Sequence, residues 1–258
     1  MMPPLFRPRP RRSRPGRAGA CPDPGRPAPG LTLRPGLGPC LLAAVAAAGL
    51  ALAPGISAAQ GCDVALLLSI DVSGSVDAGE YRLQADGLAL ALSDPQIAAA
   101  LVETEAALAV LHWSGAGMQS VVLPWARMRR PADVEAFAVA AAAAPRAFSG
   151  ADTAVGDVLD VALGQFAAVA DCRRRVIDIS GDGAQNAGSP LPPRRAAAEA
   201  AGVAVNAIAI ESIGLSITGF YRRHVITRHG FVMTARGHLD YADAIRAKIL
   251  REIGRPSS

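Results

Sequence analysis

The chain has 258 residues, of which 51% are apolar and 19% charged, enough for one α/β domain with a substantial core. The first 59 residues contain 8 of the 26 basic residues and only one of the 22 acidic ones, which leaves 18 basic and 21 acidic side chains in the rest of the chain. The formal charge of +4 therefore belongs to the first segment, and the balance elsewhere argues against nucleic acid as a partner.

Residues 1–59 have the pattern of a leader. The uncharged apolar run Leu41–Ala53 follows arginine-rich sequence and ends at Pro54, and it is shorter than the ~20 residues that span a bilayer. The small residues Ser57-Ala58-Ala59 provide a cleavage point near Gln60. We therefore predict that residues 1–59 are removed or disordered, and that the rest is exported to the periplasm or secreted without a membrane span.

Two cysteines lie in the leader, which leaves Cys62 and Cys172 as an even pair in an exported chain. An oxidising compartment favours a disulfide between them, and two separate buried thiols are the alternative. Lipid attachment at Cys62 is a further alternative, although Ala59-Gln60-Gly61 is a poor lipobox.

Strand and helix patterns alternate along the rest of the chain. Asp63–Ile70 is a near-continuous apolar run that predicts a central parallel strand, and an amphipathic pattern from Tyr81 to Leu92 predicts a helix ended by Asp94-Pro95. Ala106–Trp113 and Gln119–Leu123, joined by a short turn, predict an antiparallel hairpin at the sheet edge.

The later segments continue the alternation. The predicted strands are Arg175–Ser180, Val203–Ile210 and Phe231–Thr234, and the predicted helices are Pro131–Ala144, Thr153–Ala170, Pro192–Ala201, Ile217–Val225 and a last one aligned on Tyr241, Ile245, Ile249 and Ile253. This rhythm predicts a doubly wound α/β sheet in a single domain, residues 60–255.

Three polar clusters follow strands or open a helix where an open parallel sheet binds ligands. They contain Asp71, Ser73 and Ser75, then Thr153, then Asp182. In an Asp-x-Ser-x-Ser loop, residues one, three and five can turn toward a common point. All the side chains offer oxygen and none is His or Cys, so the indicated ion is a hard divalent cation, Mg²⁺ first, with Mn²⁺ or Ca²⁺ as alternatives.

Asp71-Val72-Ser73-Gly74-Ser75, Thr153 followed by Gly156 and Leu159, and Asp182 within Ser-Gly-Asp-Gly resemble the metal-ion-dependent adhesion site of von Willebrand factor A (vWA) domains. The resemblance extends over the whole chain after the leader. It implies direct metal contact by Ser73, Ser75 and Thr153, with Asp71 and Asp182 close by, directly or through water. A partner's Asp or Glu would take the sixth position.

The same resemblance implies a Rossmann-like, six-stranded sheet in the order 3-2-1-4-5-6 with one antiparallel edge strand. That order places Cys62 and Cys172 at the start of adjacent strands, at a spacing that a disulfide can bridge. The chain departs from the family at Ala151, where a second glycine is usual, and at Asp152, whose extra carboxylate could shift the metal preference.

Three further segments resemble an uncharacterised family of exported bacterial vWA-like proteins. They are His112-Trp113-Ser114-Gly115, Val176–Gly183 and Tyr221–Ile226. This second resemblance supports the architecture and the export, and it brings no known partner.

Three other interpretations compete for the same residues. Asp71, Ser73 or Ser75 could cap the following helix. Ser75 or Ser114 could be a hydrolase nucleophile, but neither lies in Gly-x-Ser-x-Gly, and the histidines are expected to be structural or superficial. Asp71 could accept a phosphoryl group, but enzymes of that kind generally place a second carboxylate where Ser73 stands.

We therefore predict a monomeric, non-enzymatic protein-binding domain for adhesion or assembly, with no catalytic residue. It would recognise a carboxylate of a protein partner through a bound divalent cation. The alternative is a metal-dependent phosphohydrolase that uses Asp71.

Overall fold

The structure is a computed structural model that describes residues 61–211 and 216–254 of the chain. The predicted leader lies outside these residues. No helix in the described ranges is both long and apolar enough to cross a membrane.

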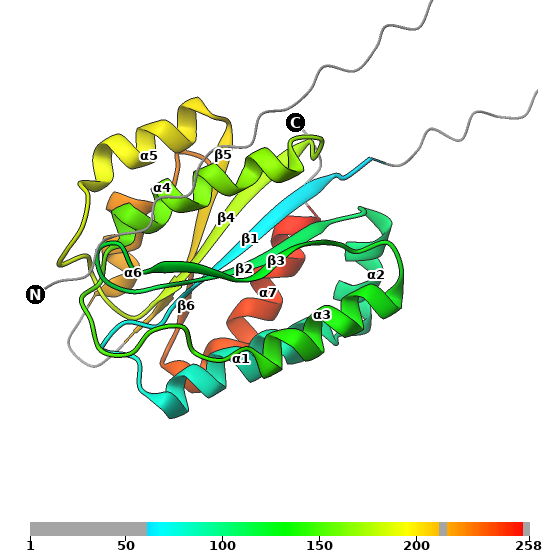
Figure 1. Cartoon of the computed structure of the whole chain (residues 1–258), viewed down its shortest axis with the longest axis horizontal. Helices are drawn as coiled ribbons and strands as arrows, with labels where there is room; N and C mark the ends of the chain where they lie inside the picture. Colours follow the sequence, from blue (N-terminus) through cyan, green and yellow to red (C-terminus); the bar gives the residue numbers. More distant parts are fainter. Residues whose placement is uncertain (1–60, 212–215, 255–258) are drawn as a thin grey trace, which may run out of the picture. The chain divides into compact units, whose positions relative to one another are not determined.

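Six strands form one sheet in the order β3-β2-β1-β4-β5-β6 (Figure 1). The strands are β1 (Val64–Asp71), β2 (Ala107–Trp113), β3 (Gln119–Arg127), β4 (Arg174–Gly181), β5 (Val203–Ile210) and β6 (Val232–Ala235). β3 runs antiparallel to β2, and all the other neighbours are parallel. The predicted doubly wound sheet, its strand order and its antiparallel edge strand are confirmed.

Helices cover both faces of the sheet. They are α1 (Ala78–Leu92), α2 (Pro95–Glu103), α3 (Pro131–Ala143), α4 (Val155–Gln165), α5 (Leu191–Ala200), α6 (Ile217–Phe220) and α7 (Tyr241–Ile253), with short 3₁₀ turns η1 (Phe166–Val169) and η3 (His238–Asp240) and a π-helical turn η2 (Tyr221–Val225). In Figure 1, α1, α2, α3 and α7 lie on one face and α4, α5 and α6 on the other. Two separate apolar cores result, one on each side of the sheet.

The central strand β1 is buried on both faces. Leu66 and Leu68 point into the core that contains α1 and α7, and Ala65 and Leu67 point into the core that contains α4 and α5. Successive side chains of a strand alternate between faces, so a strand covered on both sides needs an unbroken apolar run. This requirement explains the apolar run before Asp71. It also determines where the polar loop begins, which is at the carboxyl end of β1.

The residue that caps α1 tests whether Asp71, Ser73 or Ser75 serves as a helix cap. The cap is Asp77, whose carboxylate accepts the backbone N–H of Glu80, and Glu80 reaches back to the N–H of Asp77. The capping interpretation of Asp71, Ser73 and Ser75 is therefore wrong. The sequence pattern did not predict a second helix, α2. Asp94 follows α1 and also caps α2, whose first residue is Pro95.

A disulfide joins Cys62 and Cys172, whose Cα atoms are 4.5 Å apart. Each cysteine lies just before a strand, and the parallel register pairs Val64 of β1 with Arg174 of β4. The predicted bond is confirmed, and it fastens the amino ends of the two central strands.

Replacing both cysteines with alanine should lower the free energy of unfolding by about 4 to 5 kcal/mol. The bond closes a loop with a sequence separation of 110 residues, and closing a long loop removes entropy from the unfolded chain. Urea denaturation of the oxidised protein, the reduced protein and the double alanine variant measures the effect. Equal stability of all three would contradict it.

A buried ionic cluster ties α7 to the sheet. The ammonium of Lys248 lies 2.5 Å from Asp178 on β4 and 2.6 Å from Glu252, and the amide of Asn206 donates to the same Glu252 at 2.8 Å. All four side chains are at most 2% exposed. Burial, together with the Glu252 carboxylate and against the attraction of Lys248, raises the pKa of Asp178 to about 7.

Lys248→Met should lower the free energy of unfolding by about 3 to 5 kcal/mol, because it leaves two carboxylates buried without a counter-charge. Urea denaturation measures the loss, and adding Asp178→Asn and Glu252→Gln should recover much of it. Arg246→Met is the control on the same helix: its ion pair with Asp94 is exposed, so the change should be about 1 kcal/mol or less. A similar loss in both variants would contradict the role of the cluster.

Candidate metal centre

The carboxyl ends of β1 and β4 bring the two predicted carboxylates to one edge of the sheet. Ile70 pairs with Ser180 in the parallel register, and Asp71 and Asp182 follow these residues. The hydroxyl of Ser75 then donates to Asp182 Oδ1 at 2.6 Å across the two loops.

The loop that contains Thr153, second of the three in chain order, completes the group. Ser73 Oγ lies 3.3 Å from Ser75 Oγ, and Thr153 Oγ1 donates to Ser73 Oγ at 3.5 Å. The backbone N–H of Gly74 donates to the carbonyl of Ala151 at 2.8 Å, and a Cβ at position 74 would come within 3.0 Å of that carbonyl. Glycine at 74 is therefore what lets the first and second loops touch, and Ala151 is compatible with the contact.

The loop after β4 holds Thr153 in place. The side-chain oxygen of Asn186 accepts the Thr153 N–H at 2.7 Å, and the Asn186 N–H donates to the Thr153 carbonyl at 3.1 Å. Gln185 similarly accepts the N–H of Gly156 at 2.7 Å at the start of α4. The structure thus brings together all five residues singled out in the sequence, Asp71, Ser73, Ser75, Thr153 and Asp182.

Burial is graded across this group, which we call the oxygen cluster. Asp71 and Ser73 are fully buried, Thr153 and Asp182 are nearly so, and Ser75 is exposed. The group therefore reaches solvent on the side of Ser75.

Asp71 lies at the floor of the oxygen cluster with one oxygen unsatisfied. Its Oδ1 accepts the N–H of Ser73 at 2.8 Å, but Oδ2 has no hydrogen-bond partner among the described residues. Burial raises the pKa of Asp71 to about 7, the hydrogen bonds from Ser73 lower it, and the Asp182 carboxylate raises it. A buried carboxylate oxygen without a partner, beside hydroxyls and a second carboxylate, fits a hard divalent cation.

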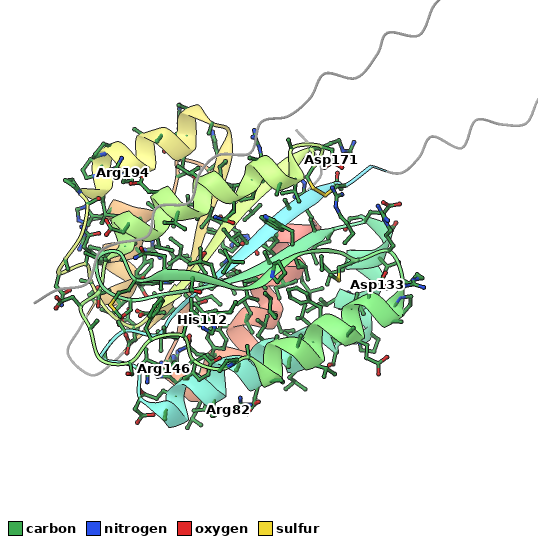
Figure 2. All side chains as sticks on the ribbon, viewed as in Figure 1. Arg82, His112, Asp133, Arg146, Asp171 and Arg194 are labelled. Carbon is green, nitrogen blue, oxygen red and sulfur yellow. A yellow bond between two sulfur atoms is a disulfide. The ribbon has the colours of Figure 1, made fainter. Side chains whose placement is uncertain are left out.

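An arginine far away in the sequence braces the first loop. One guanidinium nitrogen of Arg146 donates to the carbonyls of Val72 and Ser73, each at 2.9 Å. In Figure 2, Arg146 lies below His112, toward α1. Sequence reasoning missed Arg146, since it belongs to an irregular loop with no spacing that relates it to the Asp-x-Ser-x-Ser motif.

His112 has a structural position, as predicted. It is buried on β2 and packs edge-on against Tyr81, with ring centroids 5.4 Å apart. Burial, helped by the nearby charge of Arg146, lowers the pKa of His112 to about 4, so the ring is neutral at physiological pH.

A second missed residue, Tyr221, approaches the floor of the oxygen cluster. A Cβ built on Gly181 would overlap the Tyr221 hydroxyl and would lie 3.0 Å from Asp71 Oδ2. The Tyr221 ring is fully buried in the turn η2, and neither its hydroxyl nor Asp71 Oδ2 has a hydrogen-bond partner in the described part of the chain. Burial and the two nearby carboxylates raise the pKa of Tyr221, so it stays a neutral donor.

A groove of about 830 Å³ opens from the oxygen cluster, and Ser75, Thr153 and Asp182 line one end of it. The groove continues past α1 to the turn η3. There His238, one of the histidines expected to be structural or superficial, has a side chain only 8% exposed, and its Nδ1 lies 3.2 Å from a carboxylate oxygen of Glu80.

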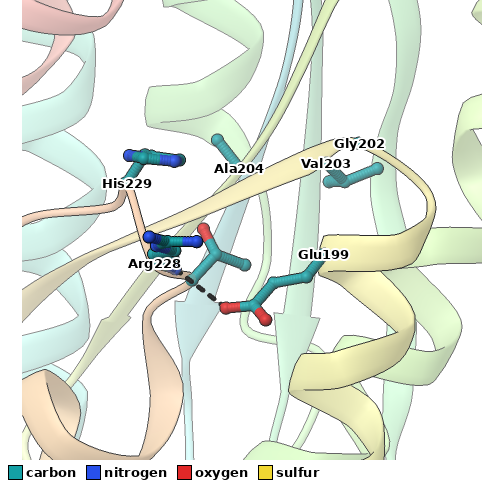
Figure 3. Close-up of a pocket in the computed structure, with 7 residues that line it drawn as sticks. Glu199, Gly202, Val203, Ala204, Arg228 and His229 are labelled. Atoms are coloured by element: carbon teal, nitrogen blue, oxygen red, sulfur yellow. Dashed lines mark hydrogen bonds between the residues drawn. The ribbon is translucent and has the colours of Figure 1, made fainter.

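Another hollow, of about 420 Å³, lies at the opposite end of β5, beside the end of α5 (Figure 3). Its one carboxylate, Glu199, already accepts the backbone N–H of Arg228 at 2.8 Å. This hollow gathers no group of oxygen ligands comparable to the oxygen cluster.

The comparison with protein families identifies the chain. Residues 61–257 match the family described as "Protein of unknown function (DUF1194)". The chain belongs to this family. A comparison with curated protein sequences gives no match.

Solved structures show the same fold. The chain is similar to a von Willebrand factor type A protein from Catenulispora acidiphila (18% identity, TM-score 0.58, 76% of this chain and 44% of that one). It is also similar to proximal thread matrix protein 1 from the mussel byssus, in a structure whose metal-ion-dependent adhesion site (MIDAS) holds zinc (16% identity, TM-score 0.54, 75% of this chain and 46% of that one). A third similar structure is the vWF domain of the pilus tip protein Mfa5 from Porphyromonas gingivalis (10% identity, TM-score 0.51, 77% of this chain and 98% of that one). The chain spans less than half of the first two proteins. The vWA-like fold implied by the sequence is confirmed.

Tyr221→Phe should weaken Mg²⁺ binding at this candidate centre by about tenfold, because the hydroxyl lies near the unpartnered Asp71 Oδ2, and groups next to a metal ligand typically contribute that much. Its fold should remain intact, since the change removes only a hydroxyl with no partner among the described residues. Tyr241→Phe is the matched control: Tyr241 is equally buried, but its hydroxyl contacts Ser180 at 3.2 Å. Calorimetric titration compares the variants, and equal losses in both would contradict a specific role for Tyr221.

Proposed function

We propose that this chain is a metal-ion-dependent protein-binding domain, used in adhesion or assembly, that recognises an Asp or Glu of a partner protein. One observation carries the proposal. Five oxygen-bearing side chains from three loops meet at the carboxyl edge of the sheet. Side-chain contacts of 2.6 to 3.5 Å link four of them, Asp71 accepts the Ser73 N–H at 2.8 Å, and the group reaches solvent at Ser75.

The five residues would have different roles in binding a cation. The hydroxyls of Ser73, Ser75 and Thr153 would contact it directly, and Asp71 and Asp182 would lie close to it, directly or through water. Two carboxylates balance a divalent charge and the hydroxyls add none, so a bound ion would supply a positive centre that still attracts another carboxylate.

Mg²⁺ is the ion we favour, with Mn²⁺ and Ca²⁺ as alternatives. Every donor is a hard oxygen, and no imidazole or thiolate belongs to the oxygen cluster. The zinc in the MIDAS motif of the mussel protein supports a divalent ion in this type of site. The pilus tip protein with the same fold supports an adhesive role.

Phosphoryl transfer at Asp71 is the alternative. Enzymes of that kind generally use a lysine near the acceptor carboxylate, and Lys248 is the only lysine in the chain. Lys248 is fully buried and paired with Asp178 and Glu252, which leaves it unavailable to a substrate. This pairing favours binding over catalysis.

We further propose that residues 60–255 act as one exported, monomeric domain after removal of residues 1–59. The disulfide between Cys62 and Cys172 supports export, because disulfides persist in oxidising compartments.

Asp71→Asn and Ser73→Ala should each abolish the heat of Mg²⁺ binding in a calorimetric titration while the protein stays folded by circular dichroism. Asp71→Asn removes the negative charge from the buried side of the oxygen cluster, and Ser73→Ala removes a hydroxyl ligand. Asp86→Asn is the control: this aspartate is 61% exposed on α1 and should leave Mg²⁺ binding unchanged.

The same samples distinguish the alternative. Incubation with a generic phosphate ester and Mg²⁺ should give no turnover. Hydrolysis that disappears in Asp71→Asn would establish the phosphohydrolase, and absence of any divalent binding by the wild-type protein would overturn both functions.

A further inference from the structure

The groove beside the oxygen cluster has an apolar wall that the fold does not need. The described part of the chain has four exposed large apolar side chains, and two of them, Leu83 at 38% and Leu239 at 83%, line this groove. Single exposed leucines are common on protein surfaces. Two at the same groove, next to a polar site, are typical of an interaction surface.

Arg236 and a cation bound at the oxygen cluster would together attract an anionic group to this groove, although carboxylates also line it. The carboxylates on its wall are already engaged: Glu80 by His238 and the Asp77 N–H, and Glu211 by the N–H groups that begin α6. Arg236 also lines the groove, and its exposed guanidinium has no hydrogen-bond or ion-pair partner within residues 61–211 and 216–254.

The oxygen cluster and the apolar wall belong to one continuous groove, because Ser75, Thr153 and Asp182 line the same hollow as Leu83 and Leu239. A segment bound there would meet a site for a carboxylate, an unpaired arginine and an apolar surface together. A carboxylate alone is common to most proteins, so the apolar wall is the part that can select among them.

We propose that this groove binds a protein segment in which an acidic residue lies within a few positions of a large apolar residue. The acidic residue goes to the oxygen cluster, the apolar side chain packs on Leu83 and Leu239, and Arg236 favours further negative charge in the segment. This inference rests on the proposed function, since it assigns the specificity of the same site.

The experiment selects peptides from a displayed random library on the immobilised full chain in Mg²⁺, with elution by EDTA. Wild-type protein should enrich peptides that combine Asp or Glu with a nearby Leu, Ile or Phe. The double variant Leu83→Ser/Leu239→Ser should still enrich acidic residues but should lose the apolar preference. Both side chains point to solvent, so the variant should fold normally.

Leu90→Ser is the matched control, because Leu90 is 67% exposed on α1 but does not line the groove. It should select the same peptides as the wild type. A selected peptide, tested by fluorescence polarisation, should bind the double variant about tenfold more weakly, as expected for the loss of a buried apolar contact, and Leu90→Ser with unchanged affinity.

The outcomes separate the two proposals. Enrichment of acidic residues without an apolar preference, or an apolar preference that survives in the double variant, would overturn this inference and leave the proposed function standing. Absence of any EDTA-sensitive acidic enrichment would overturn both.

Discussion

The parallel pairing of β1 with β4 is the constraint on which the site depends. At the amino ends the two strands are joined by the disulfide between Cys62 and Cys172, and at the carboxyl ends the loops that follow are joined by the hydrogen bond from Ser75 to Asp182. The register between these two points is therefore fixed at both ends. Because side chains alternate along a strand, a slip of one residue would turn Asp71 toward the other face and dismantle the oxygen cluster.

The floor of the oxygen cluster is an unfavourable place for a charge. Asp71 is fully buried, and an oxygen without a partner there costs free energy that an apolar residue would not. The surrounding structure limits this penalty: the Ser73 N–H donates to Asp71 Oδ1, and Arg146 donates to the carbonyls of Val72 and Ser73 in the same loop. Two complete apolar cores offset what remains. A site that is costly to fold and braced from several elements is typical of a functional rather than a structural constellation.

The sequence predicted features whose signals are local, and the resemblance to vWA domains linked the distant residues Thr153 and Asp182 to the same site and added the order of the strands. The apolar run of β1 and the Asp-x-Ser-x-Ser spacing each lie within ten residues, and the cysteine pair follows from strand order once the fold is known. The features that escaped prediction depend on contacts between distant residues. Arg146 reaches a loop 73 positions away, and nothing in the turn η2 indicates that the Tyr221 hydroxyl lies behind Asp71. The helix α2 was not predicted for a different reason. Asp94-Pro95 both follows one helix and begins the next, so the same two residues allow two interpretations.

The two parts of the proposed binding surface are subject to different physical demands. The oxygen cluster is built from close backbone contacts at Gly74, where a Cβ would lie 3.0 Å from the Ala151 carbonyl, and from side chains that are largely buried, so few substitutions there preserve the geometry of the site. The groove wall is made of side chains on α1 and η3 that point into solvent and contribute little to either core. A partner's carboxylate would therefore be recognised by the rigid part, and its identity by the part that can change without loss of stability. This separation would let one fold keep its oxygen cluster while the residues around the groove adapt to different partners.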